Sequence, residues 1–92
     1  MPNYYLGADI SKGYSDFIML DAAKRPLEDS FQLDDTFEGH HQLYSILSKF
    51  CNDHPNARIY AAVESTGGYE NNWFDALIKL QSSLPLKTAR LN

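Results

Sequence analysis

The chain has 92 residues, of which 43% are hydrophobic and 13% aromatic, so it can hold at most one domain with a thin core. Its formal net charge of −4 argues against a basic face that grips nucleic acid by charge alone, but it is compatible with an acidic, metal-holding part of a nucleic-acid enzyme. The single cysteine, Cys51, excludes an internal disulfide, and neither a membrane-length apolar stretch nor a signal peptide is found, so we expect a cytoplasmic protein that does not enter a membrane.

The first third of the chain predicts three strands joined by turns. The expected strands are residues 4–10, 15–21 and 27–33. The first is apolar on both faces, which is typical of a central strand. The third alternates, with Leu27, Phe31 and Leu33 on one face, which indicates a half-exposed edge strand.

The remainder of the chain predicts two helices, each flanked by strands. The expected elements are a helix over 35–51, a strand over 58–64, a helix over 70–81 and a strand over 84–91. Asp35 and Glu38 have the spacing of a capping box, with Asp35 in place of Ser or Thr. Residues at helical spacing predict the buried stripe of the first helix: Phe37, His40, Leu43, Tyr44, Leu47, Phe50 and Cys51. The second helix has its own apolar set: Trp73, Phe74, Leu77, Ile78 and Leu80.

This order of elements predicts an α/β fold with a mixed five-stranded sheet. The first three strands are expected to be antiparallel, because short turns join them. The last two are reached by helical crossovers and should therefore be parallel to one another. We expect residues 1–92 to be the N-terminal part of a longer domain, because no covering helix follows the last strand.

Two acidic residues, Asp9 and Glu64, each follow an apolar run and precede a turn that contains Ser or Thr and Gly. If their strands are parallel neighbours, both carboxylates project from the carboxyl-end edge of the sheet, where open α/β sheets place their sites. Two nearby carboxylates repel one another, and a divalent cation removes that conflict. Oxygen ligands favour Mg²⁺ or Mn²⁺, which can activate water for phosphodiester chemistry. For either acid alone, a solvated strand end is the simpler interpretation.

Residues beside these acids each have two interpretations. Ser11 and Thr66 could hydrogen-bond the carboxylates as supporting groups, or could serve only the turns. Lys12 could neutralise the acids or contact phosphate, or could be a solvated turn lysine. Gly67 permits backbone angles that are closed to other residues. Tyr69 could stack on a base, or could pack at the start of the helix.

Two segments of the chain resemble the start of the IS110-family transposases. Residues 7–12, GADISK, match the family's Gly-x-Asp-x-Ser-Lys opening, and residues 64–69, ESTGGY, match its Glu-x-Thr-Gly-x-Tyr block. The resemblance covers essentially the whole chain. It implies the N-terminal, RuvC-like part of a domain of the ribonuclease H-like superfamily.

The resemblance also implies a function in DNA transposition and recombination. The family carries an Asp-Glu-Asp-Asp (DEDD) set that binds divalent metal for DNA cleavage and strand transfer, and Asp9 and Glu64 would be its first two catalytic acids. The last two acids lie beyond this segment in the family, so we expect the chain alone to be inactive and to bind Mg²⁺ or Mn²⁺ weakly. The implied partners are DNA and, in some members, a structured guide RNA.

Two other functions remain open from the sequence. Fragments of actin-, hexokinase- and Hsp70-like ATPases also begin with an apolar strand, an acid and a small-residue hairpin that meets phosphate, although such hairpins usually have Gly where Lys12 lies. A non-catalytic assembly domain is the other alternative. It would use the uncovered strand expected at 84–91 as an edge that pairs with another copy, giving a homo-oligomer.

Overall fold

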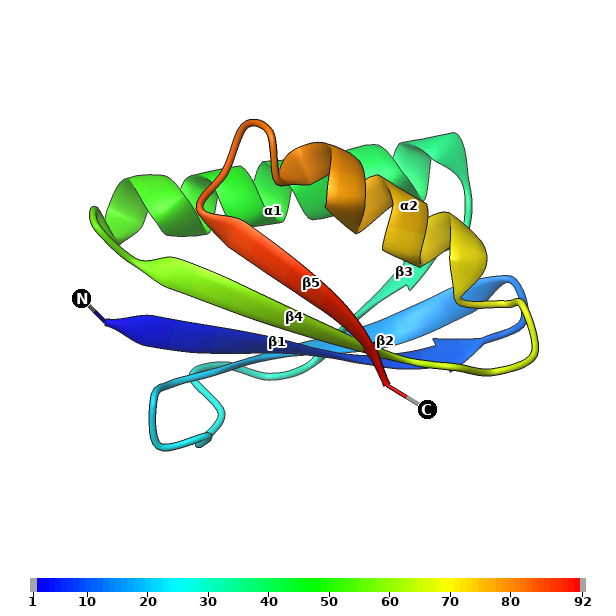
Figure 1. Ribbon diagram of the computed structural model, residues 1–92, viewed down its shortest axis with the longest axis horizontal. Helices are drawn as coiled ribbons and strands as arrows, with labels where there is room; N and C mark the ends of the chain where they lie inside the picture. The colour runs from blue at the N-terminus through cyan, green and yellow to red at the C-terminus, as the bar shows by residue number, and fades with distance from the viewer. Residues whose placement is uncertain (1, 92) are drawn as a thin grey trace.

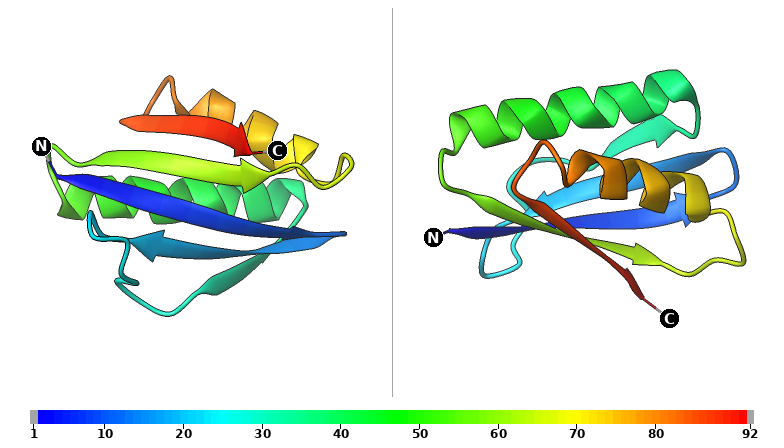
Figure 2. Two further views of the ribbon diagram at one scale, coloured as in Figure 1. Left: turned by 60° about the horizontal axis from the view of Figure 1, so that its bottom comes forward. Right: turned by 45° about the horizontal axis from the view of Figure 1, so that its top comes forward.

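The computed structural model describes residues 2–91, which form one five-stranded sheet with both helices on the same face (Figure 1). The strands are β1 (Asn3–Ser11), β2 (Tyr14–Leu20), β3 (Phe31–Asp34), β4 (Arg58–Glu64) and β5 (Leu86–Leu91). The helices are α1 (Phe37–Asp53) and α2 (Asn71–Leu80). Figure 2 shows the other face of the sheet, which no helix of the described residues covers.

The sheet is mixed, as the order of elements predicts. Its strand order is β3-β2-β1-β4-β5, so β1 is central. The pairs β1–β2 and β2–β3 are antiparallel, whereas β1–β4 and β4–β5 are parallel. The predicted α/β class, the antiparallel start and the parallel pairing of the last two strands are therefore confirmed.

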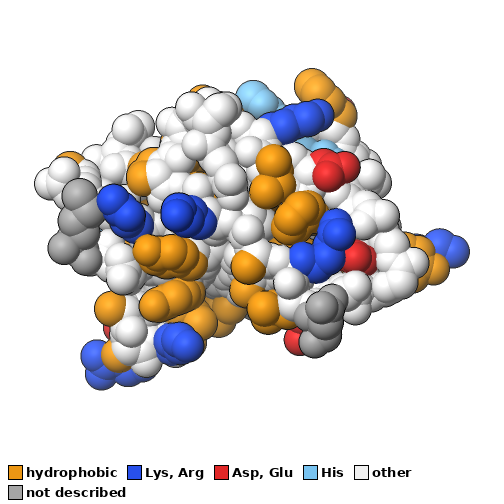
Figure 3. Space-filling view, in the orientation of Figure 1, with side chains coloured by type: hydrophobic (Ala, Val, Ile, Leu, Met, Phe, Trp, Pro, Cys, Tyr) orange, Lys and Arg blue, Asp and Glu red, His pale blue; other side chains and the backbone are white. Residues whose placement is uncertain are grey.

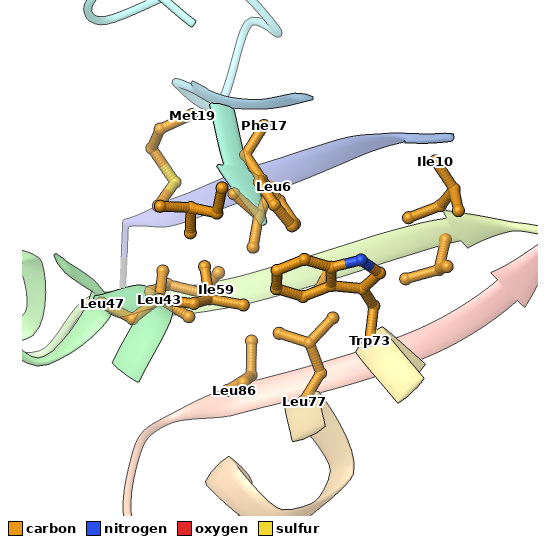
Figure 4. Packing of buried hydrophobic residues seen from close by; sticks show 13 residues of the cluster. Leu6, Ile10, Phe17, Met19, Leu43, Leu47, Ile59, Trp73, Leu77 and Leu86 are labelled. Carbon is orange, nitrogen blue, oxygen red and sulfur yellow. The ribbon is translucent and has the colours of Figure 1, made fainter. Parts of the chain in front are cut away.

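The core lies between the sheet and the two helices (Figure 4). Successive side chains of a strand point to opposite faces, so every second residue of each strand turns toward the helices. The strands contribute Leu6, Ile10, Phe17, Met19, Leu33, Ile59, Ala61, Val63 and Leu86. The helices contribute Leu43, Leu47, Trp73 and Leu77.

The third strand is shorter than its alternation predicts. Residues 27–33 were expected to be extended, but β3 begins only at Phe31, and Leu27 is 41% exposed. Pro26 forms only an isolated bridge to Leu20. Leu27 still donates its N–H to the carbonyl of Met19 at 3.0 Å, but the continuous pairing with β2 begins only where Phe31 lies opposite Phe17. The predicted edge position of this strand is confirmed.

The first helix begins one residue later than the capping box predicts. Thr36, not Asp35, is the N-cap, because its Oγ1 accepts a hydrogen bond from the N–H of Gly39 at 3.0 Å. Asp35 Oδ1 instead lies 2.7 Å from His40 Nε2. Phe37 is 87% exposed, contrary to expectation. It lies two residues, or about 200° of helical rotation, from the buried Gly39.

The buried stripes of both helices are narrower than their apolar spacing predicts. Tyr44 of α1 is 39% exposed and Ile78 of α2 is 40% exposed. A helix that packs on one face of a sheet buries a single stripe and leaves its flanks in water. Consistent with this amphipathic character, none of the helices in residues 2–91 has the length and apolar content needed to cross a membrane.

The other elements differ from expectation only at their ends. β4 occupies the expected residues 58–64. α1 continues to Asp53, and α2 loses one residue at each end. β5 begins at Leu86, because the N–H of Leu84 still donates to the carbonyl of Leu80 at the end of α2.

Candidate functional site

Asp9 and Glu64 lie at corresponding ends of two neighbouring parallel strands. β1 and β4 pair with Ala8 opposite Val63, and the two acids are the next residues along each strand. Both acids are exposed, and both line one open hollow of about 530 Å³. Since Ile10 and Val63 point into the core, Asp9 and Glu64 face away from the helices. The structure thus brings together the two acids that the sequence singled out.

The same hollow holds a third acid that the sequence analysis missed. Asp16 of β2 lies directly opposite Asp9 and lines the hollow, and its Oδ1 accepts a hydrogen bond from Gln32 Nε2 at 3.2 Å. Directly opposed like charges in an antiparallel pair destabilise it, so this arrangement favours a bound cation. The signal was present in the sequence. A two-residue turn at Lys12 and Gly13 sets a register in which Asp9 meets Asp16.

The donor chemistry of the hollow suits a hard divalent cation, because carboxylate oxygens are the ligands that Mg²⁺ and Mn²⁺ prefer. The number of ligands is small. Within residues 2–91, no group of three or more His, Cys, Asp or Glu side chains is placed so that it could hold a metal ion. Asp9 and Glu64 would therefore supply part of a coordination shell, which water, substrate oxygens or further protein ligands would complete.

A buried carboxylate, also missed in the sequence analysis, organises the turn that follows Glu64. Glu70 is 3% exposed. Its Oε1 accepts hydrogen bonds from the N–H of Thr66 at 3.0 Å, the hydroxyl of Thr66 at 3.1 Å and the N–H of Gly68 at 3.0 Å. Arg90 of β5 places its Nε 3.6 Å from Oε2. The hydroxyl of Thr66 thus donates to Glu70 and not to Glu64.

The other predicted supporting residues lie in the two turns beside the acids. Ser11 is the last residue of β1 and is partly buried, and Lys12 is exposed at the tip of the β1–β2 hairpin. Gly67 has a φ of 76°, a left-handed value that favours glycine. Tyr69 is 50% exposed. Of this group, Lys12 and Tyr69 are exposed enough to contact a ligand, whereas Gly67 allows the backbone conformation of the turn.

The environment of Glu70 makes folding depend on pH in the acid range. The backbone N–H of Thr66, helped by the N–H groups of Glu70 and Gly68 and by the Thr66 hydroxyl, lowers the pKa of Glu70 from 4.5 to about 2. A carboxyl whose pKa is lower in the folded state stabilises that state above the unfolded pKa. This contribution is present above pH 4.5 and is lost as the pH falls toward 2.

We therefore expect a Glu70→Gln variant to be less stable than wild type at neutral pH, with a difference that narrows as the pH falls from 4.5 to 2. Urea unfolding at a series of pH values gives the free energy of unfolding of both proteins. The contributions of the carboxylates that both proteins share cancel in the difference. Asp75→Asn, which changes an exposed carboxylate of α2, the helix that follows Glu70, is the matched control and should show no such narrowing. A difference between wild type and Glu70→Gln that stays constant with pH would contradict this assignment.

Comparisons with protein-family models and with curated proteins give no match for this chain. Within residues 2–91, the hollow that Asp9, Asp16 and Glu64 line is the clearest candidate site.

Proposed function

We propose that this chain is part of a metal-dependent DNA-processing domain, in which Asp9 and Glu64 bind Mg²⁺ or Mn²⁺. The observation that carries the proposal is that both acids line one hollow, beside corresponding ends of parallel strands. Two carboxylates at neighbouring positions of paired strands repel one another, and a bound cation would remove that repulsion. The resemblance to IS110-family transposases supports the same chemistry, with DNA cleavage and strand transfer as the activity of the full-length protein.

The ribonuclease H-like, RuvC-like fold is part of the same proposal. The mixed sheet starts with three antiparallel strands, and helical crossovers lead to the last two. One acid lies on the central strand β1 and the other ends its parallel neighbour β4. These features agree with the fold that the resemblance implies.

The roles of the chain's own residues follow from their charges and positions. Asp9 and Glu64 would hold the cation at the edge of the sheet, and Asp16 adds negative charge that favours its binding. The bound cation would stabilise negative charge on phosphodiester oxygens and on the attacking oxygen. Because two carboxylates leave most of a hexacoordinate shell unfilled, the chain by itself is expected to bind metal weakly and not to cleave DNA.

Titration with Mn²⁺, followed through the paramagnetic broadening of backbone amide NMR signals, tests the metal site. We expect broadening centred on the ends of β1 and β4. Asp9→Asn and Glu64→Gln should each weaken binding at least about tenfold, since even the loss of an outer-shell partner has that effect. Asp75→Asn on α2 is the control. Broadening spread evenly over the acidic residues, or unchanged by both substitutions, would contradict the proposal.

An assembly role is the second candidate, and the position of β5 favours it. β5 lies at one edge of the sheet, so one side of its backbone faces away from β4. On that side the N–H of Thr88 donates to Gln81 Oε1 at 2.6 Å, and a pairing strand would have to displace this bond. Sedimentation equilibrium at high protein concentration tests this role. A dimer that Thr88→Pro disrupts would support it, because the N–H of Thr88 points away from β4, and a monomer at all concentrations would exclude it.

A further inference from the structure

We propose that the helix-free face of the sheet binds a single-stranded nucleic acid through two stacked tyrosines and three cations. We call these five residues the aromatic–basic patch: Tyr5, Tyr60, Lys24, Arg58 and Lys87. The inference rests on the proposed function and deepens it, because it places the substrate on the face that also carries the acids.

Strand pairing arranges the side chains of this face in rows, on the side of the sheet that lies in front of the helices in the left view of Figure 2. Tyr5 is opposite Tyr60, which is opposite Lys87. Two residues further along the strands comes a row of small residues: Gly7, Ala62 and Ala89. Two residues beyond that row come the acids: Asp16, Asp9 and Glu64.

The two tyrosines form a platform on which a base could stack. Their ring centroids are 5.8 Å apart and their planes differ by 30°. The Nζ of Lys24 lies 5.3 Å from the centroid of the Tyr5 ring. Both tyrosines are partly buried, so the sheet holds the rings in place while part of each remains accessible. Nucleic acid bases of any identity stack on such rings, provided that they are not paired in a duplex.

The charges around this platform match a polyanion. Lys24, Arg58 and Lys87 are all exposed, and none of them forms an ion pair with a residue in the range 2–91. Figure 3 shows Lys and Arg side chains grouped with hydrophobic ones toward the end of the sheet where β1 begins. The whole chain carries a net charge of −4, so this local excess of cations is contrary to its average charge. A protein partner that only covered apolar surface would need no such cations, whereas phosphates do.

The row of small residues links the aromatic–basic patch to the acids. Gly7, Ala62 and Ala89 carry no side chain larger than a methyl group, so a bound strand can lie close to the sheet. Tyr5 and Asp9 are four residues apart on β1, which corresponds to about 13 Å. A strand stacked on Tyr5 and Tyr60 would therefore reach the acids within a few nucleotides.

A pair of charge-matched variants tests the contact with phosphates. Fluorescence anisotropy measures binding of a labelled oligothymidylate of about 12 nucleotides at several salt concentrations, with EDTA present. Three phosphate contacts predict a slope of log K against log salt of about −2, and Lys87→Gln should make it shallower by about 0.7. Lys79→Gln removes the same charge from an exposed position on α2 and should leave the slope unchanged.

A second pair of variants tests stacking. Tyr60→Leu keeps apolar bulk but removes the ring, so binding should weaken about tenfold, whereas Tyr60→Phe should bind like wild type. Tyr44→Leu, on the outer side of α1, is the matched control and should have no effect. If Tyr60→Leu does not fold, the comparison of Lys87→Gln with Lys79→Gln still decides the inference.

Several results would overturn the inference. Lys87→Gln and Lys79→Gln could change the salt slope equally, or folded Tyr60→Leu could bind the oligothymidylate as tightly as wild type. A duplex of equal length could bind more tightly than the single strand, or the protein could self-associate in a way that Tyr60→Leu abolishes. Binding of the oligothymidylate, or of an oligouridylate of the same length, would support the inference. The tighter binder of the two would show whether the patch prefers DNA or RNA. Because this binding is measured without metal, its failure is separate from failure of the Mn²⁺ titration of Asp9 and Glu64.

Discussion

Replacing Trp73 by alanine is expected to lower the free energy of unfolding by about 3–5 kcal/mol. Trp73 of α2 is fully buried, and Figure 4 shows its indole within the cluster between the sheet and the helices. Its ring centroid lies 4.9 Å from that of Phe17 and 4.6 Å from that of His40. The side chain therefore joins the second helix to the sheet and to the first helix. A domain of this size has a total stability of only about 5–14 kcal/mol, so the loss would leave it close to unfolding.

Urea unfolding followed by far-ultraviolet circular dichroism measures this effect, since the chain's one tryptophan is removed. Trp73→Phe is the matched variant. It keeps an aromatic ring and removes an indole N–H that has no hydrogen-bond partner among the described residues. We expect it to lose only about 1–2 kcal/mol, because the cavity is smaller and no hydrogen bond is broken. If the Ala and Phe variants had equal free energies of unfolding, packing of an aromatic ring at position 73 would not be the source of the stabilisation.

Replacing Gly39 by alanine is expected to destabilise the fold by about 1–3 kcal/mol, even though alanine favours helices over glycine by about 1 kcal/mol. Gly39 lies in the first turn of α1 and is buried. A Cβ at this position would overlap the backbone carbonyl of Asp34 at the end of β3. A backbone atom cannot rotate away as a side chain can, so the junction of β3 and α1 would have to shift. The steric effect therefore outweighs the gain in helix propensity.

Thermal and urea unfolding of Gly39→Ala, compared with Ser45→Ala, separates these two effects. Ser45 lies on the exposed side of the same helix. Its replacement by alanine brings the propensity gain without a clash and should stabilise the protein by about 0.5 kcal/mol. If Gly39→Ala were as stable as wild type or more stable, the close approach of β3 to α1 would be disproved.

The sequence alone determined the types of the elements and the order of their connections. Apolar patterning is a local property, so the apolar run over residues 58–64 and the helical spacing near Leu43 and Leu47 did not depend on tertiary contacts. The convergence of Asp9 and Glu64 could also be expected, because it follows from two apolar runs joined by a helical crossover. Its assignment to a metal ion stays a prediction.

Only the tertiary structure decided which of several locally equivalent residues takes a role. Thr36 and Asp35 could each cap α1, and the choice depends on the contact between Asp35 and His40. Glu70 looked like the first residue of an amphipathic helix, yet its carboxylate holds the turn after Glu64, because folding brings the N–H groups of that turn around it. Such choices depend on neighbours in space and on competition for hydrogen-bond partners, which a linear pattern of residue types does not encode.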